Sequence, residues 1–95
     1  MFLRITRGSY LPETEADVRQ IVEELMIPAL RGLPGFQHYY GGVNRSTGAL
    51  VAVSVWDTEE HANFPREALA GTVPALVGKG VRLELAEIYD VLVDA

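Results

Sequence analysis

The beginning of the chain alternates between apolar and polar residues. In an extended conformation Leu3 and Ile5 point to one side of residues 2–10 and Arg4 points to the other. This period of two residues is typical of a β-strand. Pro12 follows shortly afterwards. Because proline has no backbone N–H to donate to a sheet, we expect the strand to end before it.

The next stretch has the spacing of an amphipathic helix, with apolar residues three or four positions apart: Val18, Ile21, Val22, Leu25 and Ala29. Thr14 precedes these residues, and its side-chain oxygen is expected to cap the first turn. Pro28 is expected to kink or restart the helix. The Gly-Leu-Pro-Gly sequence at 32–35 is expected to end it.

Two extended segments joined by a turn predict an antiparallel hairpin. Residues 36–43 are rich in aromatic side chains, residues 44–48 read Asn-Arg-Ser-Thr-Gly, and residues 49–56 are mostly apolar. The middle segment has the composition of a turn.

The second strand of this hairpin has two different faces. One face carries Val51, Val53 and Val55, and the other carries Ala52, Ser54 and Trp56. On the first strand we expect Tyr39 and Val43 to extend the valine face. His38 and Tyr40 are expected to share a strand side with Phe36.

The second half of the chain predicts another helical region and a last strand. Asp57 or Thr58 can cap the helix, and prolines and glycines should divide residues 59–78 into two or three short pieces. Apolar and polar residues alternate again over 81–85, and the phase slips near residues 86–87 before an apolar segment at 88–93. We expect a bulge or bend there.

The order of elements is therefore β-α-β-β-α-β, and a short internal repeat divides it into halves. Ile-Pro-Ala-Leu-Arg-Gly at 27–32 recurs as Val-Pro-Ala-Leu-Val-Gly at 73–78. Each copy would close the helical part of one half, as in a ferredoxin-like split βαβ fold. The fold class predicted is α+β with a ferredoxin-like βαββαβ order, in one domain over residues 1–95. Right-handed crossovers put both helical regions on one face of the sheet.

The uncovered face of this sheet predicts an assembly. The valine face would be an exposed apolar patch, and such patches usually mark interfaces. Two sheets stacked across a two-fold axis would bury both patches. The apolar C-terminal segment at 88–93 could exchange with the partner. We therefore expect a homodimer.

Composition and charge exclude several partners and sites. Eight basic and thirteen acidic residues give a net charge of −5, which disfavours nucleic acid and anionic membranes as partners. The chain has no cysteine and only two histidines, His38 and His61. Because these have no metal-ligand spacing and there is no glycine-rich phosphate loop, we expect neither a metal nor another cofactor. No apolar run is long enough for a membrane span, so we expect a soluble, cytoplasmic protein.

Two motifs give the chain a family resemblance. Val-Ser-Val-Trp-Asp-Thr-Glu-Glu-His at 53–61 is a valine-rich strand that ends in tryptophan and runs through an acidic cap into a helix, and Leu-Pro-Gly-Phe at 33–36 precedes the second strand. With these motifs and this element order, the chain resembles the antibiotic biosynthesis monooxygenase-like group of dimeric α+β barrel proteins. The resemblance implies a cofactor-independent oxygenase. Its aromatic or quinol-like substrate, once deprotonated, would react with dioxygen in a pocket between sheet and helices.

The resemblance also implies candidate site residues. Trp56 matches the pocket tryptophan of the family, and Ala52 and Ser54 leave room beside it. The other possibility for Trp56 is a core residue whose indole N–H has found an acceptor. His38 could point into the pocket as a general base.

Further polar or aromatic residues could reach a ligand or could simply lie on the surface: Arg4, Thr6, Tyr10, Tyr40 and Asn63. The haem-degrading relatives use an asparagine on the first strand and a histidine after the tryptophan in the second helical region. Residues 2–10 hold no asparagine, and no histidine follows His61. Haem degradation is therefore disfavoured. Two function classes remain open: a small-molecule oxygenase, and a non-catalytic barrel that binds a hydrophobic ligand or serves as a structural dimer.

Overall fold

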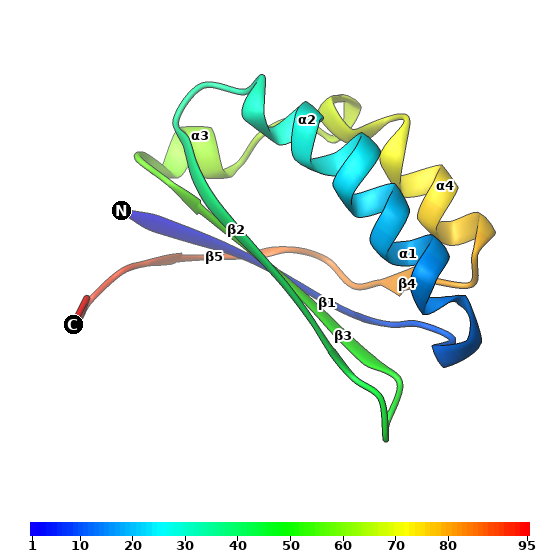
Figure 1. Ribbon diagram of the computed structural model, residues 1–95. Coiled ribbons are helices and arrows are strands. Elements are labelled where there is room, and N and C mark those ends of the chain that lie inside the picture. Colours follow the sequence, from blue (N-terminus) through cyan, green and yellow to red (C-terminus); the bar gives the residue numbers. More distant parts are fainter.

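A five-stranded antiparallel sheet carries all of the helices on one of its faces (Figure 1). The computed structural model describes residues 1–95. Its strands and helices are β1 (Phe2–Ser9), α1 (Glu15–Ile21), α2 (Ile27–Arg31), β2 (Phe36–Asn44), β3 (Ala49–Trp56), α3 (Glu59–Ala62), α4 (Thr72–Gly78), β4 (Arg82–Leu83) and β5 (Glu87–Asp90). The strand order is β2-β3-β1-β4, with β5 also paired to β1. This confirms the α+β, ferredoxin-like fold.

The first helical region is continuous but not regular. A 3₁₀ turn, Pro12–Thr14, leads into α1, and a π-helical turn, Val22–Met26, separates α1 from α2. Pro28 comes directly after this π-helical turn, at the beginning of α2. Because proline has no N–H for the regular hydrogen bond to residue i−4, the α-helical pattern restarts there, as expected, although the helical conformation is continuous. The expected cap is wrong. The Thr14 hydroxyl donates to the carbonyl oxygens of Leu11 and Lys79 instead of accepting from the helix.

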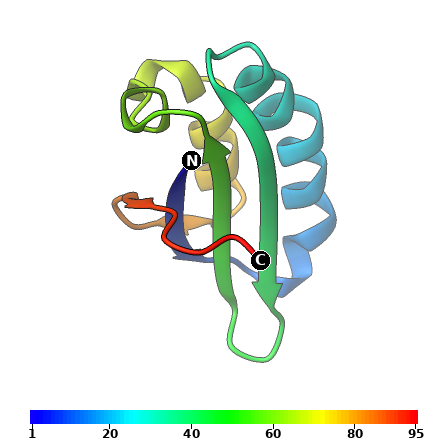
Figure 2. The same ribbon diagram turned by 90° about the vertical axis from the view of Figure 1, so that its left-hand side faces the viewer.

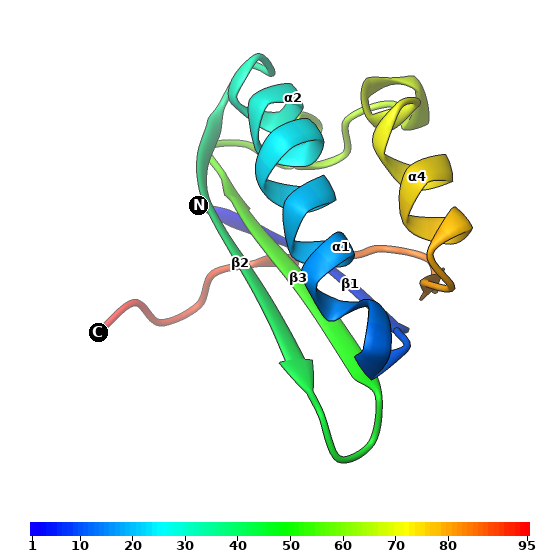
Figure 3. The same ribbon diagram turned by 45° about the vertical axis from the view of Figure 1, so that its right-hand side comes forward.

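The second helical region forms three short pieces, as expected: α3, a 3₁₀ turn at Arg66–Leu69, and α4. Thr58 caps α3 by accepting a hydrogen bond from the backbone N–H of His61. Figure 3 separates the two helical regions, which both lie over the same face of the sheet. None of the helices is both long enough and apolar enough to cross a membrane.

The two halves of the internal repeat occupy equivalent places. Leu30, near the end of α2, and Leu76, near the end of α4, are each only 2% exposed. Both belong to the core, which also contains Trp56, Met26 and Val81. In each helical region, the repeated sequence therefore marks the turn whose leucine is buried in the core between the helices and the sheet.

A β-bulge at Gln37 changes the faces of β2. Phe36 is opposite Trp56, but His38, two residues later, is opposite Val55, only one residue earlier on β3. The extra residue reverses the alternation of every side chain that follows.

The expected faces of β2 are consequently wrong. Tyr39 and Val43 turn toward the helices and pack against the core. His38 and Tyr40 turn to the helix-free face, where their ring centroids are 4.4 Å apart. A strand pattern with an inserted residue cannot be told from a regular one until its hydrogen-bonded partner is known.

The helix-free face has an apolar strip, as the valines of β3 predicted, next to the ion pair of Arg7 and Glu87. Val51, Val53 and Val55 are half-buried there, and Leu3 and Ile5 of β1 lie beside them in the antiparallel register. Figure 2 views this face, over which no helix lies.

The C-terminal strand is interrupted, as expected. β4 and β5 both pair with β1, and residues 84–86 between them leave the regular ladder. β5 ends at Asp90, earlier than the expected 93. Beyond it Leu92 is 96% exposed and Val93 is 78% exposed, so this part of the apolar segment has no cover within the chain.

The carboxylate of Glu15 ties the hairpin turn to the first helix. Arg45 donates to both carboxylate oxygens, with Nε–Oε1 and Nη2–Oε2 distances of 2.9 Å. The Tyr10 hydroxyl donates to Oε1 at 3.0 Å. The hydrogen bonds from Arg45 and then Tyr10 hold the pKa of Glu15 below its usual value.

We expect Glu15→Gln to make the protein less sensitive to acid. A carboxyl group with a lowered folded-state pKa stabilises the fold above its unfolded-state pKa, and this contribution is lost as the pH falls through the folded-state value. Thermal unfolding midpoints should therefore fall more steeply for the wild type than for Glu15→Gln between about pH 5 and about pH 3. Glu67→Gln, at an exposed carboxylate without an ion pair, should behave like the wild type. Equal slopes for wild type and Glu15→Gln would contradict the expectation.

Candidate functional site

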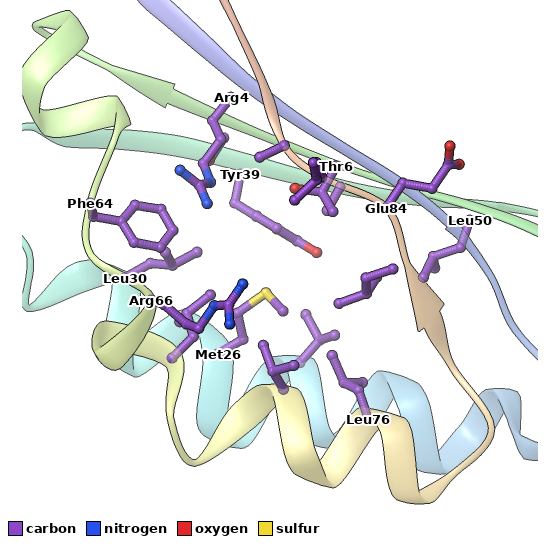
Figure 4. A pocket seen from close by; sticks show the side chains of 18 of the residues that line it. Arg4, Thr6, Met26, Leu30, Tyr39, Leu50, Phe64, Arg66, Leu76 and Glu84 are labelled. Atoms are coloured by element: carbon purple, nitrogen blue, oxygen red, sulfur yellow. The ribbon is translucent and has the colours of Figure 1, made fainter.

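A cavity of about 630 Å³ lies between the sheet and the two helical regions (Figure 4). Its sheet wall includes Arg4, Thr6, Tyr39, Ala52 and Ser54. Its helix wall is apolar and includes Val18, Val22, Met26, Leu30 and Leu76. Fourteen of the nineteen lining residues are hydrophobic. A cavity of this size with few polar groups is typical of a small-molecule site.

The small residues of β3 create this space. Ala52 and Ser54 face the helices, opposite Thr6 and Arg4 of β1 in the antiparallel register. Because their side chains are short, the sheet and the helices cannot close against each other at this point. Ala52 and Ser54 thus line the cavity, where the sequence placed them.

Arg4 brings a positive charge to the sheet wall. Its Nη1 donates to the carbonyl oxygen of Ala62 at 3.0 Å, and its guanidinium carbon lies 4.1 Å from the centre of the Phe64 ring. This is cation–π geometry. Burial lowers the pKa of Arg4 because desolvation disfavours the charged form.

Hydroxyl groups supply further hydrogen-bonding capacity. The Tyr39 side chain extends into the cavity from β2 (Figure 4), and burial raises the pKa of its phenol. Tyr39 is therefore a neutral donor at physiological pH. The Ser54 oxygen accepts a hydrogen bond from Trp56 Nε1 at 2.8 Å, which leaves its own proton free to donate.

The cavity reaches the surface beside the interrupted C-terminal strand. Glu84, Leu85 and Ala86 line it there, and Leu85 is 86% exposed. Arg66 lines it from the 3₁₀ turn of the second helical region and is also exposed. A ligand could therefore enter between this turn and residues 84–86.

Comparison with solved structures finds this architecture in other proteins. A Deinococcus radiodurans protein described as a candidate antibiotic biosynthesis monooxygenase is 21% identical with a TM-score of 0.73, over 100% of this chain and 96% of that one. SnoaB, a cofactor-independent oxygenase from Streptomyces nogalater, is 17% identical with a TM-score of 0.68, over 98% and 94% of the two chains. Another structure described as an antibiotic biosynthesis monooxygenase is 23% identical with a TM-score of 0.61, over 100% and 98%.

The chain has the fold of the antibiotic biosynthesis monooxygenases. The resemblance found in the sequence is confirmed at this level. No protein-family model and no curated protein matches the sequence.

Within this monooxygenase fold, Trp56 lies in the core and does not line the cavity. It is 0% exposed and packs against Phe36 and Phe64, with ring centroids 5.4 and 5.2 Å away. Its indole N–H has an acceptor in Ser54. Trp56 is therefore a core residue, the second of its two possible roles. Ser54, which accepts its hydrogen bond, is the residue that lines the cavity.

Two expected cavity residues lie on the other face of the sheet. The bulge at Gln37 turns both His38 and Tyr40 away from the helices, and neither lines the cavity. The Tyr40 side chain is 64% exposed. The expectation that His38 and Tyr40 wall the pocket is therefore wrong, and Tyr39 takes that place in the monooxygenase fold.

Two other candidates also lie outside the cavity lining. Tyr10 is 3% exposed, and its hydroxyl is directed to Glu15. Asn63 is exposed at the end of α3. His61 pairs with Asp57 at 2.7 Å outside the cavity. The structure contains no group of three or more histidine and carboxylate side chains arranged to hold a metal ion.

Of the polar residues that do line the cavity, the sequence pointed to Arg4 and Thr6 as possible ligand contacts but missed Tyr39, Arg66 and Glu84. The alternation in β1 was the signal for the first two. Tyr39 was hidden by the bulge. Arg66 and Glu84 lie in irregular or interrupted segments, where no periodic pattern assigns a direction to a side chain.

Proposed function

We propose that this chain is a cofactor-independent oxygenase that acts on an aromatic, quinol-like compound in the cavity between sheet and helices. The observation that carries the proposal is the cavity itself, a mostly apolar space with a guanidinium and three hydroxyl groups on its sheet wall. The fold shared with SnoaB supports the same reaction type. The substrate would supply the electrons and react directly with dioxygen. In the keto form of the substrate, the ring carbon to be oxidised carries two hydrogens. One oxygen atom would become the carbonyl oxygen on that carbon, and the other would leave in water with its two hydrogens.

The residues of the cavity would stabilise a deprotonated substrate. Apolar walls exclude water and so strengthen electrostatic interactions inside the cavity. Arg4, Tyr39 and Ser54 present N–H and O–H donors on one wall, where charge delocalised over an aromatic oxyanion would be stabilised. His38 lies on the other face of the sheet, so the proposal gives it no part in proton transfer.

Filling the cavity should abolish turnover without unfolding the protein. We expect wild-type protein to accelerate oxygen uptake by an anthrone, whose methylene carbon becomes a carbonyl, in an oxygen electrode. Ala52→Leu should reduce that rate at least about tenfold, because the added carbons occupy the substrate space. Ala16→Leu, on the exposed side of α1, adds the same atoms outside the cavity and should retain the wild-type rate.

A binding protein without catalysis is the second candidate, favoured by the absence of any histidine from the cavity lining. Ligand binding that Ala52→Leu abolishes, together with oxygen uptake at background, would decide for this second function. Equal rates above background in wild type and Ala52→Leu would contradict catalysis in the cavity, and equal ligand affinities of the two proteins would contradict both uses of the cavity.

We also propose that two chains assemble through their helix-free faces. The half-buried valines of β3 and the exposed Leu92 and Val93 beyond β5 support this assembly, because both would gain cover from a second copy. Light scattering at micromolar concentration should give twice the mass of one chain.

Val53→Asp should shift the protein to a monomer, because it places a charge at the centre of this apolar face. Val77→Asp, at a 55% exposed position on α4, should leave the assembly unchanged. A monomeric wild type at micromolar concentration would contradict the proposed dimer.

A further inference from the structure

Arg4 is a partly buried cation without an anionic partner. The four ion pairs of the protein involve other basic residues, namely Arg7, Arg45, His61 and Lys79. The only protein acceptor of Arg4 is the carbonyl oxygen of Ala62. A guanidinium has five N–H donors, so most of its donors have no acceptor in the protein. No buried polar side-chain atom is left without a partner, and the unused Arg4 donors therefore remain accessible from the cavity.

This arrangement leaves the charge of Arg4 partly desolvated and without an anion. Removing a cation from water costs free energy unless an anion or hydrogen-bond acceptors replace the solvent. The face of Phe64 compensates in part through the cation–π contact. A purely structural role, to hold the Ala62 carbonyl, would need only one neutral donor. The fork of donors directed at the cavity is suited to a planar oxyanion.

A second guanidinium approaches the cavity from the opposite side. Arg66, in the 3₁₀ turn, points into the cavity from the helix wall, whereas Arg4 points in from the sheet (Figure 4). Arg66 likewise has no ion pair. Both arginines lie toward Phe64, and Leu50 and Leu76 lie toward the other end. The cavity is thus positively charged at one end, and most of the residues that line the rest are apolar.

We propose that the cavity binds an aromatic carboxylic acid, with its carboxylate held by Arg4 and Arg66 at the Phe64 end and its ring system among the apolar side chains. A carboxylate is ionised at neutral pH and therefore pairs with the arginines in the bound ground state, not only after substrate deprotonation. This inference rests on the proposed use of the cavity for substrate and adds an acid group to that substrate.

Three naphthalene compounds test the inference by equilibrium binding, measured by calorimetry at pH 7. 1-Naphthoate carries the carboxylate, 1-naphthalenemethanol is its neutral counterpart, and 1-naphthol can ionise only at higher pH. We expect 1-naphthoate to bind at least about tenfold more tightly than the alcohol. Arg4→Met should lower the affinity for 1-naphthoate by about 10- to 100-fold, the range for loss of charged hydrogen bonds. Its affinity for the alcohol should stay within about twofold of the wild-type value.

Further variants separate binding from folding. Arg66→Met should lower the affinity for 1-naphthoate but not that for the alcohol. Because Arg66 is exposed, we expect this variant to fold like the wild type. Arg4→Lys should recover part of the affinity because it restores charge but not the two-pronged geometry. Arg19→Met, on the exposed side of α1, is the control for loss of one positive charge and should bind like the wild type.

Several results would overturn the inference. Equal affinity of the wild type for 1-naphthoate and the alcohol, or no binding of any probe, would do so without any variant. Parallel loss of both ligands in Arg4→Met and Arg66→Met would assign these residues a structural role. Tighter binding of 1-naphthol as the pH rises through its pKa, to an affinity above that of 1-naphthoate, would identify a phenolate site. Oxygen uptake by a neutral anthrone would still support the proposed oxygenase in each case. An acid preference without oxygen uptake would support the inference alone.

Discussion

Trp56→Ala is expected to lower the free energy of unfolding by about 3–5 kcal/mol, the usual cost of emptying a large buried aromatic site. The indole is fully buried, and it packs against both Phe36 and Phe64. Phe64 in turn lies under the Arg4 guanidinium, so the void left by alanine would also loosen one end of the candidate site. Urea unfolding followed by circular dichroism measures the change without relying on tryptophan fluorescence.

Two controls define what Trp56 does. Leu85→Ala removes a side chain that is 86% exposed and should change stability by less than about 0.5 kcal/mol. Trp56→Phe retains most of the ring packing but removes the donor to Ser54, and we expect an intermediate loss of about 1–3 kcal/mol. Because Trp56 does not line the cavity, Trp56→Phe should keep ligand affinity within a few-fold. A large loss of affinity with unchanged stability would instead place Trp56 in contact with the ligand.

Gly35→Ala is expected to cost about 2–4 kcal/mol, from backbone strain and steric overlap together. Gly35 has a φ of 79°, a conformation that residues with a Cβ rarely adopt. A Cβ atom there would lie 2.0 Å from Asp57 Oδ1 and 2.4 Å from His61 Nδ1. The substitution would therefore separate the Asp57–His61 pair from the turn that precedes β2, where the Gly35 carbonyl accepts from the Asp57 N–H.

Urea unfolding again measures the free energy of unfolding. The control is Gly78, a glycine with open space around it. No atom lies within 4 Å of a Cβ at Gly78 in α4, so Gly78→Ala should be neutral or stabilising by up to about 1 kcal/mol. In an Asp57→Ala background Gly35→Ala should cost less, because the nearest clashing atom is gone and only the strain and the histidine contact remain. A cost of Gly35→Ala below about 0.5 kcal/mol in the wild-type background would show that the turn can rearrange freely.

The sequence determined the order of the elements and the two faces of β3, because these follow from local periodicity. The strand at 49–56 has no inserted residue, so the alternation of valines with Ala52 and Ser54 predicted correctly which side chains leave space under the helices. Prolines and glycines likewise marked where the helical regions restart or end, since their backbone limits act on the nearest residues.

Tertiary structure alone decided which side chains meet in the cavity. The bulge at Gln37 exists only in the pairing of β2 with β3. This one extra residue puts Tyr39 at the cavity wall, in place of His38 and Tyr40. Trp56 had two possible environments in the sequence, and the packing of Phe36 and Phe64 around it chose the core. Alternation predicted that Arg4 lies on the other face of β1 from Leu3 and Ile5. Arg4 lines the cavity, and is not fully exposed to solvent, because the helices pack on that face. Local periodicity fixes the relative direction of neighbouring side chains, whereas their surroundings depend on contacts between segments distant in the chain.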